Sequence, residues 1–80
     1  MIRINVILYA AEWCPGCKKS VEWLSKNKIP FTYIDIEKDN ALWEALQAKI
    51  HSLGIPVLKV DDSYIIGFRP DEYSKKILGD

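Results

Sequence analysis

The sequence predicts an α/β domain in which a mixed four-stranded sheet is flanked by three helices, in the order β-α-β-α-β-β-α. Strand-like apolar segments alternate with segments whose apolar residues recur at helical spacing. The last two strand-like segments, residues 56–60 and 64–66, are separated by a short polar turn and are expected to form an antiparallel hairpin. With 80 residues and no linker or repeat, the chain is expected to form a single domain over residues 1–80.

The first half of the chain predicts a strand, a helix and a second strand. Residues Ile2–Tyr9 alternate weakly and then run apolar, which is typical of a strand covered on both faces. From Pro15 to about Lys28 the apolar residues recur at helical spacing, and Pro30 ends this segment. Residues Phe31–Ile36 are rich in β-forming side chains. Such a βαβ unit needs parallel strands and a right-handed crossover.

The second half of the sequence predicts two more helices, one before the hairpin and one after it. Asp39 or Asn40 is expected to cap the first of them, and Gly54 to end it. Its apolar residues form a stripe at helical spacing: Leu42, Leu46, Ile50 and Leu53. Pro70 suits the first position of the last helix. The tryptophans of the helices are expected to pack in the interior: Trp23 and Trp43.

Composition excludes several classes of function. Lysines and arginines number 11, as do aspartates and glutamates, so the chain lacks the basic surplus of a nucleic-acid-binding protein. The longest apolar stretch, residues 4–11, is interrupted by Asn5 and is much shorter than the ~20 residues that span a bilayer. Its flanks do not resemble those of a secretory signal. We therefore expect a cytoplasmic protein that binds neither nucleic acid nor membrane.

The two cysteines occur in Cys14-Pro15-Gly16-Cys17, where the first strand gives way to the first helix. As a structural disulfide this pair would close too short a loop to restrain much of the chain. At a helix start, the unpaired backbone N–H groups and the helix dipole favour a thiolate at Cys14, and Lys18 adds positive charge. Cys17 follows one turn later, toward the core. Cys14 is therefore expected to attack a disulfide and Cys17 to resolve the mixed disulfide.

A metal site is the alternative interpretation of paired cysteines. A zinc or iron–sulfur site needs about four ligands. Beyond the cysteine pair, the chain has one histidine, His51, which lies far along the sequence on another predicted helix. The sequence therefore predicts no metal within one chain. A metal or iron–sulfur cluster shared between two chains through Cys14 remains a lesser alternative.

Three motifs follow one another along the chain: Cys14-Pro15-Gly16-Cys17, then Gly54-Ile55-Pro56, then Gly67-Phe68-Arg69-Pro70-Asp71. Together they resemble the thioredoxin-fold redoxins, most closely small glutaredoxin-like proteins of the NrdH-redoxin type. The resemblance implies a thioredoxin (glutaredoxin-like) fold and a dithiol–disulfide oxidoreductase that carries electrons to client protein disulfides. It also implies a cis peptide bond before Pro56, whose ring keeps metal from the thiols, and substrate pairing with the Ile55 backbone.

Substrate binding is expected around these motifs. Trp13 precedes the attacking cysteine and offers an apolar wall to a partner protein. In the expected fold Phe68 lies beside Pro56 and extends this apolar rim. Glu12 is interpreted as a solvated turn residue, with a part in proton transfer as the alternative. The residues expected to bind substrate are Trp13, Pro15, Ile55, Pro56, Gly67 and Phe68.

The source of electrons is left open between two classes of reductant. Glutathione-using glutaredoxins usually carry a lysine three residues before the attacking cysteine and a Gly-Gly-x-Asp-Asp stretch near the end. Ala11 and Phe68 replace the lysine and the second glycine here, which favours a thioredoxin-reductase-type enzyme over glutathione as co-substrate. The cysteine sulfurs carry the electrons, so no bound cofactor is expected. The resemblance implies ribonucleotide reductase as a client, and we expect a monomer.

Overall fold

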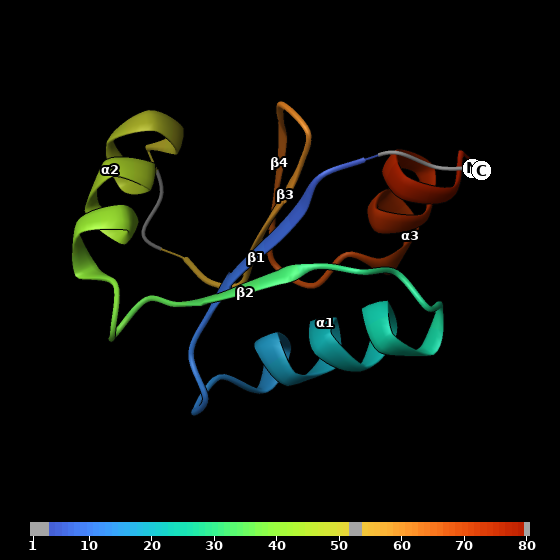
Figure 1. The fold of residues 1–80 in the computed structure, drawn as a ribbon, viewed down its shortest axis with the longest axis horizontal. Helices are drawn as coiled ribbons and strands as arrows, with labels where there is room; N and C mark the ends of the chain where they lie inside the picture. Colours follow the sequence, from blue (N-terminus) through green and yellow to red (C-terminus); the bar gives the residue numbers. More distant parts are fainter. Residues whose placement is uncertain (1–3, 52–53, 80) are drawn as a thin grey trace.

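The computed structural model describes residues 4–51 and 54–79, and its elements follow the predicted order (Figure 1). The strands are β1 (Val6–Ala10), β2 (Thr32–Asp35), β3 (Val57–Val60) and β4 (Ser63–Ile66). The helices are α1 (Pro15–Lys26), α2 (Asn40–Ile50) and α3 (Pro70–Tyr73), and α3 continues into a π-helical segment, η1 (Ser74–Leu78). The predicted α/β architecture is confirmed. Ile2 and Leu53, which belonged to predicted elements, lie outside the described residues.

The four strands form one mixed sheet in the order β2-β1-β3-β4. β1 pairs in parallel with β2, whereas the β1–β3 and β3–β4 pairs are antiparallel. The register places Tyr9 opposite both Ile34 and Val57, and Val57 opposite Ile66. The ends of β1, β2 and β4 and the start of β3 therefore meet at one edge of the sheet. This edge positions the functional site.

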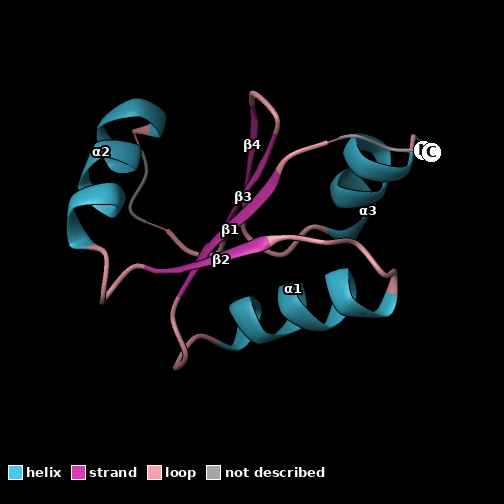
Figure 2. Ribbon diagram, in the orientation of Figure 1, coloured by secondary structure: helices cyan, strands magenta, loops and turns pink. Residues whose placement is uncertain are grey.

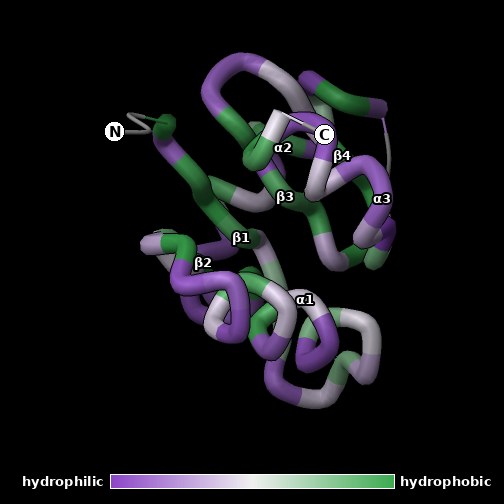
Figure 3. Tube along the Cα trace, turned by 90° about the vertical axis from the view of Figure 1, so that its right-hand side faces the viewer, coloured by the Kyte–Doolittle hydropathy of each residue, from purple (hydrophilic) through white to green (hydrophobic). Residues whose placement is uncertain are grey.

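Helices cover both faces of the sheet (Figure 2). Successive side chains of a strand point to opposite faces, so Val6, Leu8 and Ala10 pack with Leu24 of α1 and Tyr73 of α3. On the opposite face a second cluster joins the sheet to α2: Tyr9, Ala11, Ile36, Trp43, Leu46 and Val57. In Figure 3 the hydrophobic colour runs along β1 and β3, which lie in the middle of the sheet between these two clusters. None of the described helices is long and apolar enough to cross a bilayer.

The apolar face of α2 differs from the predicted stripe. Leu42, a member of the predicted stripe, is 49% exposed, while the adjacent Trp43 is buried with Leu46. Trp43, Leu46 and Ile50 are spaced three and four residues apart, so they share one face of the helix as well as the predicted set would. Packing against the sheet selects the face that buries the larger indole ring. The interior place of Trp43 was predicted correctly, and Trp23 packs edge-on against the Tyr73 ring at 5.5 Å.

Two helices end earlier than predicted. α1 ends at Lys26, and Lys28 has a φ of 57°, which belongs to no right-handed helix. α2 ends at Ile50, and His51 takes the left-handed conformation with its N–H donating to the Gln47 carbonyl at 2.8 Å. The prediction that Gly54 ends this helix was therefore wrong. Glycine is preferred at a left-handed cap, but other residues also occupy it, and here the histidine does so.

Candidate active site

The three sequence motifs come together at the sheet edge described above. The loop after β1 carries the first cysteine, the start of β3 carries Pro56, and the end of β4 leads into Gly67. The Gly67 N–H donates to the Pro56 carbonyl at 2.7 Å and joins the last two segments, while the Ile36 N–H donates to the Ala10 carbonyl at 3.0 Å and joins the ends of β2 and β1. The sheet topology thus unites residues that lie far apart in the chain.

Cys14 lies at the start of α1, as predicted, and is its N-cap residue. Its backbone is extended, with φ −89° and ψ 117°, and its Sγ accepts a hydrogen bond from the Cys17 N–H at 3.2 Å. The Lys18 N–H closes the first helical turn by donating to the Cys14 carbonyl at 3.2 Å. An amide donor at a helix start stabilises a sulfur anion more than a neutral thiol. The Cys14 residue is 6% exposed.

Cys17 has different surroundings, although it lies only one turn away. Both cysteines are free thiols, but Cys17 is 1% exposed and belongs to the core between α1 and the sheet. Burial, and next the hydrogen bond with Cys14, raise the pKa of Cys17 to about 12, although the Ala11 backbone amide partly offsets this effect. Cys17 is therefore a neutral thiol near neutral pH and must lose its proton before it can act as a nucleophile.

Pro56 packs directly against the cysteine motif. The Ile55–Pro56 peptide bond is cis, as the resemblance implied. A Cβ atom added to Gly16 would lie 3.3 Å from the Pro56 Cδ, so a larger residue at position 16 would press on the proline ring. Pro15 is exposed at the first position of α1, and Ile55 is half-buried between the two core clusters.

Gly67 and Phe68 border the site on the β4 side. Gly67 has a φ of 90°, a conformation that favours glycine. The Phe68 ring packs edge-on against Tyr73 at 5.8 Å between ring centres. Tyr73 is fully buried, and its hydroxyl lies 3.0 Å from the Gly67 carbonyl and 2.9 Å from the Ser20 Oγ.

Sequence reasoning missed Ser20 and Tyr73 as parts of this region. They lie 53 residues apart, and no local pattern pairs a helical serine with a tyrosine at that distance. Ser20 is fully buried, and its Oγ also donates to the Gly16 carbonyl at 3.1 Å. A serine on the buried face of the cysteine helix is the one sequence signal that suggests a buried polar partner.

Trp13 lies on the other side of the site, toward β2. It is 65% exposed, and its Nε1 donates to the Glu37 carboxylate at 3.0 Å. Glu37, which follows β2, was another residue that sequence reasoning missed. The structure thus places Trp13 on the β2 side and Phe68 on the β4 side, and the cysteine motif lies between them along the sheet edge.

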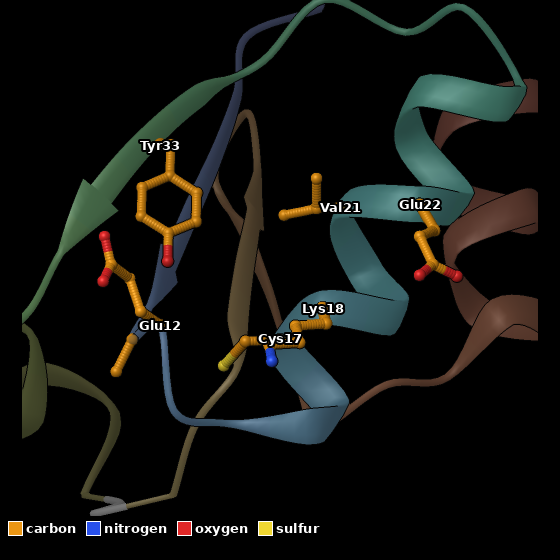
Figure 4. Close-up of a pocket in the computed structure, with 7 residues that line it drawn as sticks. Glu12, Cys17, Lys18, Val21, Glu22 and Tyr33 are labelled. Carbon is orange, nitrogen blue, oxygen red and sulfur yellow. The ribbon is translucent and has the colours of Figure 1, made fainter.

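A groove of about 350 Å³ runs along α1 on the side that faces β2 (Figure 4). Cys17 reaches its wall, and Lys18, predicted as electrostatic support, is an exposed residue at its rim. The full lining is Ala11, Glu12, Cys17, Lys18, Val21, Glu22 and Tyr33. Within residues 4–51 and 54–79, no three His, Cys, Asp or Glu side chains converge to form a metal site.

A free dithiol at a helix start, packed against a cis-proline on a four-stranded mixed sheet, defines the class of thioredoxin-fold thiol–disulfide oxidoreductases. The glutaredoxin family model matches residues 6–65 of this chain. The protein therefore belongs to the glutaredoxin family and, within it, to the glutaredoxin-like redoxins of the NrdH type.

Two relatives and one solved structure illustrate the similarity. The glutaredoxin-like protein NrdH of Lactococcus lactis subsp. cremoris is 34% identical over 73 residues, covering 88% of this chain and 96% of that protein. An uncharacterized glutaredoxin-like 8.6 kDa protein in the rubredoxin operon of Clostridium pasteurianum is 31% identical over 88% of this chain and 93% of its own. The glutaredoxin-like NrdH-redoxin of Escherichia coli superposes with a TM-score of 0.83 at 24% identity, over 89% of this chain and 92% of that one.

Proposed function

We propose that this protein is a small electron carrier that reduces disulfides of client proteins through Cys14 and Cys17. The Cys14 thiolate attacks a client disulfide, forms a mixed disulfide and releases one client sulfur as a thiolate. Cys17 then loses its proton, forms a bond to the Cys14 sulfur and releases the second client sulfur. Two electrons pass to the client, which leaves as a dithiol, and the cysteine pair is left as a disulfide.

The observation that carries this proposal is the unequal surroundings of the two sulfurs. The Cys14 Sγ sits at the helix start and receives the Cys17 amide at 3.2 Å, whereas Cys17 is 1% exposed and its raised pKa keeps it protonated. At Cys17 the effect of burial outweighs that of the Ala11 backbone amide, so the pKa of Cys17 is raised. This difference supports attack by Cys14 and resolution by Cys17.

The client is proposed to bind over the sheet edge that carries the cysteines. Trp13, 65% exposed, offers a broad aromatic face on one side, and the half-buried Phe68 borders the other. The segment Ile55–Pro56 lies between them against the helix start, where its backbone can pair with an extended client. No bound cofactor enters the proposal, and the resemblance makes ribonucleotide reductase the first client to test.

We further propose that a thioredoxin-reductase-type enzyme supplies the electrons. Ala11 is 1% exposed and brings no cation to the place where glutathione-using relatives usually carry a lysine. Phe68 fills the place of their second glycine with a ring that packs on Tyr73. Both features weaken a site for the glutathione carboxylates. A thioredoxin-like activity profile is described for the structurally similar Escherichia coli protein, which supports the same choice.

The test supplies the oxidised protein with NADPH and either thioredoxin reductase or glutathione with glutathione reductase, and follows NADPH oxidation with insulin as client. Turnover is expected with thioredoxin reductase and is expected to be lost in Cys14→Ser. An Ala11→Lys/Phe68→Gly double variant serves as the matched comparison, because it restores two features of a glutathione site and is expected to gain glutathione-linked turnover. Faster turnover of the unchanged protein with glutathione would overturn the choice of reductant.

A metal or cluster carrier is the competing class of function. The expected preparation is colourless and metal-free, with two titratable thiols in the reduced state. A coloured, dimeric preparation that loses its chromophore when Cys14 is replaced by serine would favour the shared cluster instead.

A further inference from the structure

We infer that the carboxylate of Glu12 takes the proton of Cys17, through water in the groove between α1 and β2, when Cys17 resolves the mixed disulfide. The inference deepens the proposed function, on which it rests, because it assigns the proton acceptor for the step that releases the client.

Resolution of the mixed disulfide needs a proton acceptor because the surroundings of Cys17 disfavour loss of its proton. It is 1% exposed, and burial raises its pKa to about 12. Only a thiolate attacks a disulfide efficiently, so a buried neutral thiol at neutral pH would resolve the mixed disulfide slowly. A base near the sulfur removes this obstacle if a path for the proton exists.

The groove provides such a path. It has a volume of about 350 Å³, and Cys17 contributes to its wall together with Glu12, Lys18 and Tyr33. A water molecule takes up roughly 30 Å³ in the liquid, and polar groups line this groove, so it has room and partners for bridging water. In Figure 4 the Cys17 sulfur points toward the side of the groove that Glu12 and Tyr33 occupy, whereas Glu22 lies on the opposite side.

Among the described residues, the titratable groups that line the groove with Cys17 or interact with it are Glu12, Cys14, Lys18, Glu22, Tyr33 and Tyr73. During resolution the Cys14 sulfur is bonded to the client and holds no charge. Lys18 has no acceptor atom when protonated. Burial, followed by the charge of Cys17, raises the pKa of Tyr73, and its hydroxyl is held inside the core. None of these three groups can take the proton.

Tyr33 is also excluded as the acceptor, but it helps to locate one. Burial raises its pKa, and the negative charges of Asp35, Cys17 and Glu12 add to the effect in that order. The phenol therefore stays neutral and is too weak a base to keep the proton, although its hydroxyl can donate to or accept from groove water. Glu12, Cys17 and Tyr33 line the same groove, and Glu12 lies on the side toward which the Cys17 sulfur points (Figure 4). Glu12 is exposed, so it can pass the proton on to bulk water.

The atoms and electrons of the step balance. The Cys17 S–H bond breaks, and the proton moves through water to the Glu12 carboxylate. A bond forms between the sulfurs of Cys17 and Cys14, and the bond between Cys14 and the client sulfur breaks. The client sulfur leaves as a thiolate with the electron pair of that bond, and the Glu12 carboxylic acid then releases its proton to solvent.

Rapid mixing of the reduced protein with one equivalent of Ellman's reagent, an aromatic disulfide, tests the inference. Attack by Cys14 releases one coloured thionitrobenzoate, and resolution by Cys17 releases the second, so a single trace reports both steps. Glu12→Gln is expected to slow the second phase about 10- to 100-fold, a range typical of losing a general base, without slowing the first. Because hydroxide replaces the missing base, the second phase of this variant is expected to recover as the pH rises.

Glu22→Gln is the matched control, since it removes a carboxylate from the opposite side of the same groove and is expected to leave both phases unchanged. An equal second phase in Glu12→Gln and the unchanged protein, with the same pH profile, would overturn the inference. So would an equal loss in Glu22→Gln. The proposed function fails separately, if Cys14→Ser retains the first phase or Cys17→Ser retains the second.

Discussion

At the scale of single residues, the cysteines show how position in a helix separates two chemically identical groups. The Cys14 Sγ caps α1 and accepts a hydrogen bond from the Cys17 N–H, while Cys17 itself is buried in the cluster between α1 and the sheet. The surroundings of Cys14 provide a hydrogen-bond donor that stabilises a thiolate. The surroundings of Cys17 exclude water and so destabilise a thiolate. In the proposed mechanism, one helical turn separates the nucleophile from the resolving thiol.

This difference predicts the order of alkylation. A limiting amount of iodoacetamide near neutral pH is expected to modify Cys14 at least about tenfold faster than Cys17, because Cys17 is both buried and protonated. Peptide mapping by mass spectrometry measures the two rates. In guanidinium chloride the unfolded chain is expected to show nearly equal rates. Faster labelling of Cys17 in the folded protein would contradict the assignment of roles.

At the scale of elements, Ser20 and Tyr73 connect the cysteine helix to the loop at Gly67. Three close contacts join these groups: Ser20 Oγ to the Gly16 carbonyl, Ser20 Oγ to Tyr73 OH, and Tyr73 OH to the Gly67 carbonyl. The two hydroxyls have only two protons between them, so one of the three contacts lacks a proton at any moment. Two of the three possible proton arrangements place a proton between Ser20 and Tyr73, whereas the third leaves their two oxygens 2.9 Å apart without one.

Replacing Tyr73 by phenylalanine is expected to destabilise the protein by about 1 to 2 kcal/mol, because the ring packing stays and the buried hydroxyl partners are lost. Urea unfolding monitored by circular dichroism measures this cost. Tyr33→Phe is the comparison, since Tyr33 is 40% exposed and its hydroxyl faces the groove, and its change is expected to be small. A cost no larger for Tyr73→Phe than for Tyr33→Phe would show that the network adds nothing to stability.

Helix α2 shows what apolar periodicity in the sequence cannot determine, namely which face of a helix is buried and where the helix ends. Two overlapping sets of residues on α2 have helical spacing, one containing Leu42 and the other Trp43, and periodicity alone does not choose between them. The choice follows from which side chain fills the space next to Val57 and Ile36 on the sheet. The end of α2 at His51 likewise depends on the path to β3, not on a glycine signal.

At the scale of the whole molecule, buried acidic side chains are expected to lower the free energy of unfolding as the pH becomes alkaline. Burial raises the pKa of Cys17 to about 12 and that of Tyr73 above the ordinary tyrosine value. A raised pKa means that the native state keeps a proton which the unfolded chain releases. The contribution of Cys17 is therefore complete below the ordinary thiol value of 9.0 and is lost as the pH rises through about 12.

The free energy of unfolding of the reduced protein is expected to fall continuously above pH 9, the ordinary value for a thiol. Urea titrations at a series of alkaline pH values measure the slope. In Cys17→Ala the fall is expected to begin nearer pH 10, the ordinary tyrosine value, since the tyrosines then remain as the buried acids. A free energy that stays constant through this range would contradict the burial of the Cys17 thiol.

Local patterns in the sequence by themselves determined the order of the elements, the helix start at Cys14 and the order of the three motifs, because each depends on neighbours in the chain. Only the tertiary structure decided the meeting of the cysteine motif with Pro56 and Gly67, the hydrogen bonds of Tyr73 with Ser20 and of Trp13 with Glu37, and the groove beside Cys17. These features join segments that sheet pairing brings together, and their burial and distances depend on side chains from several elements at once.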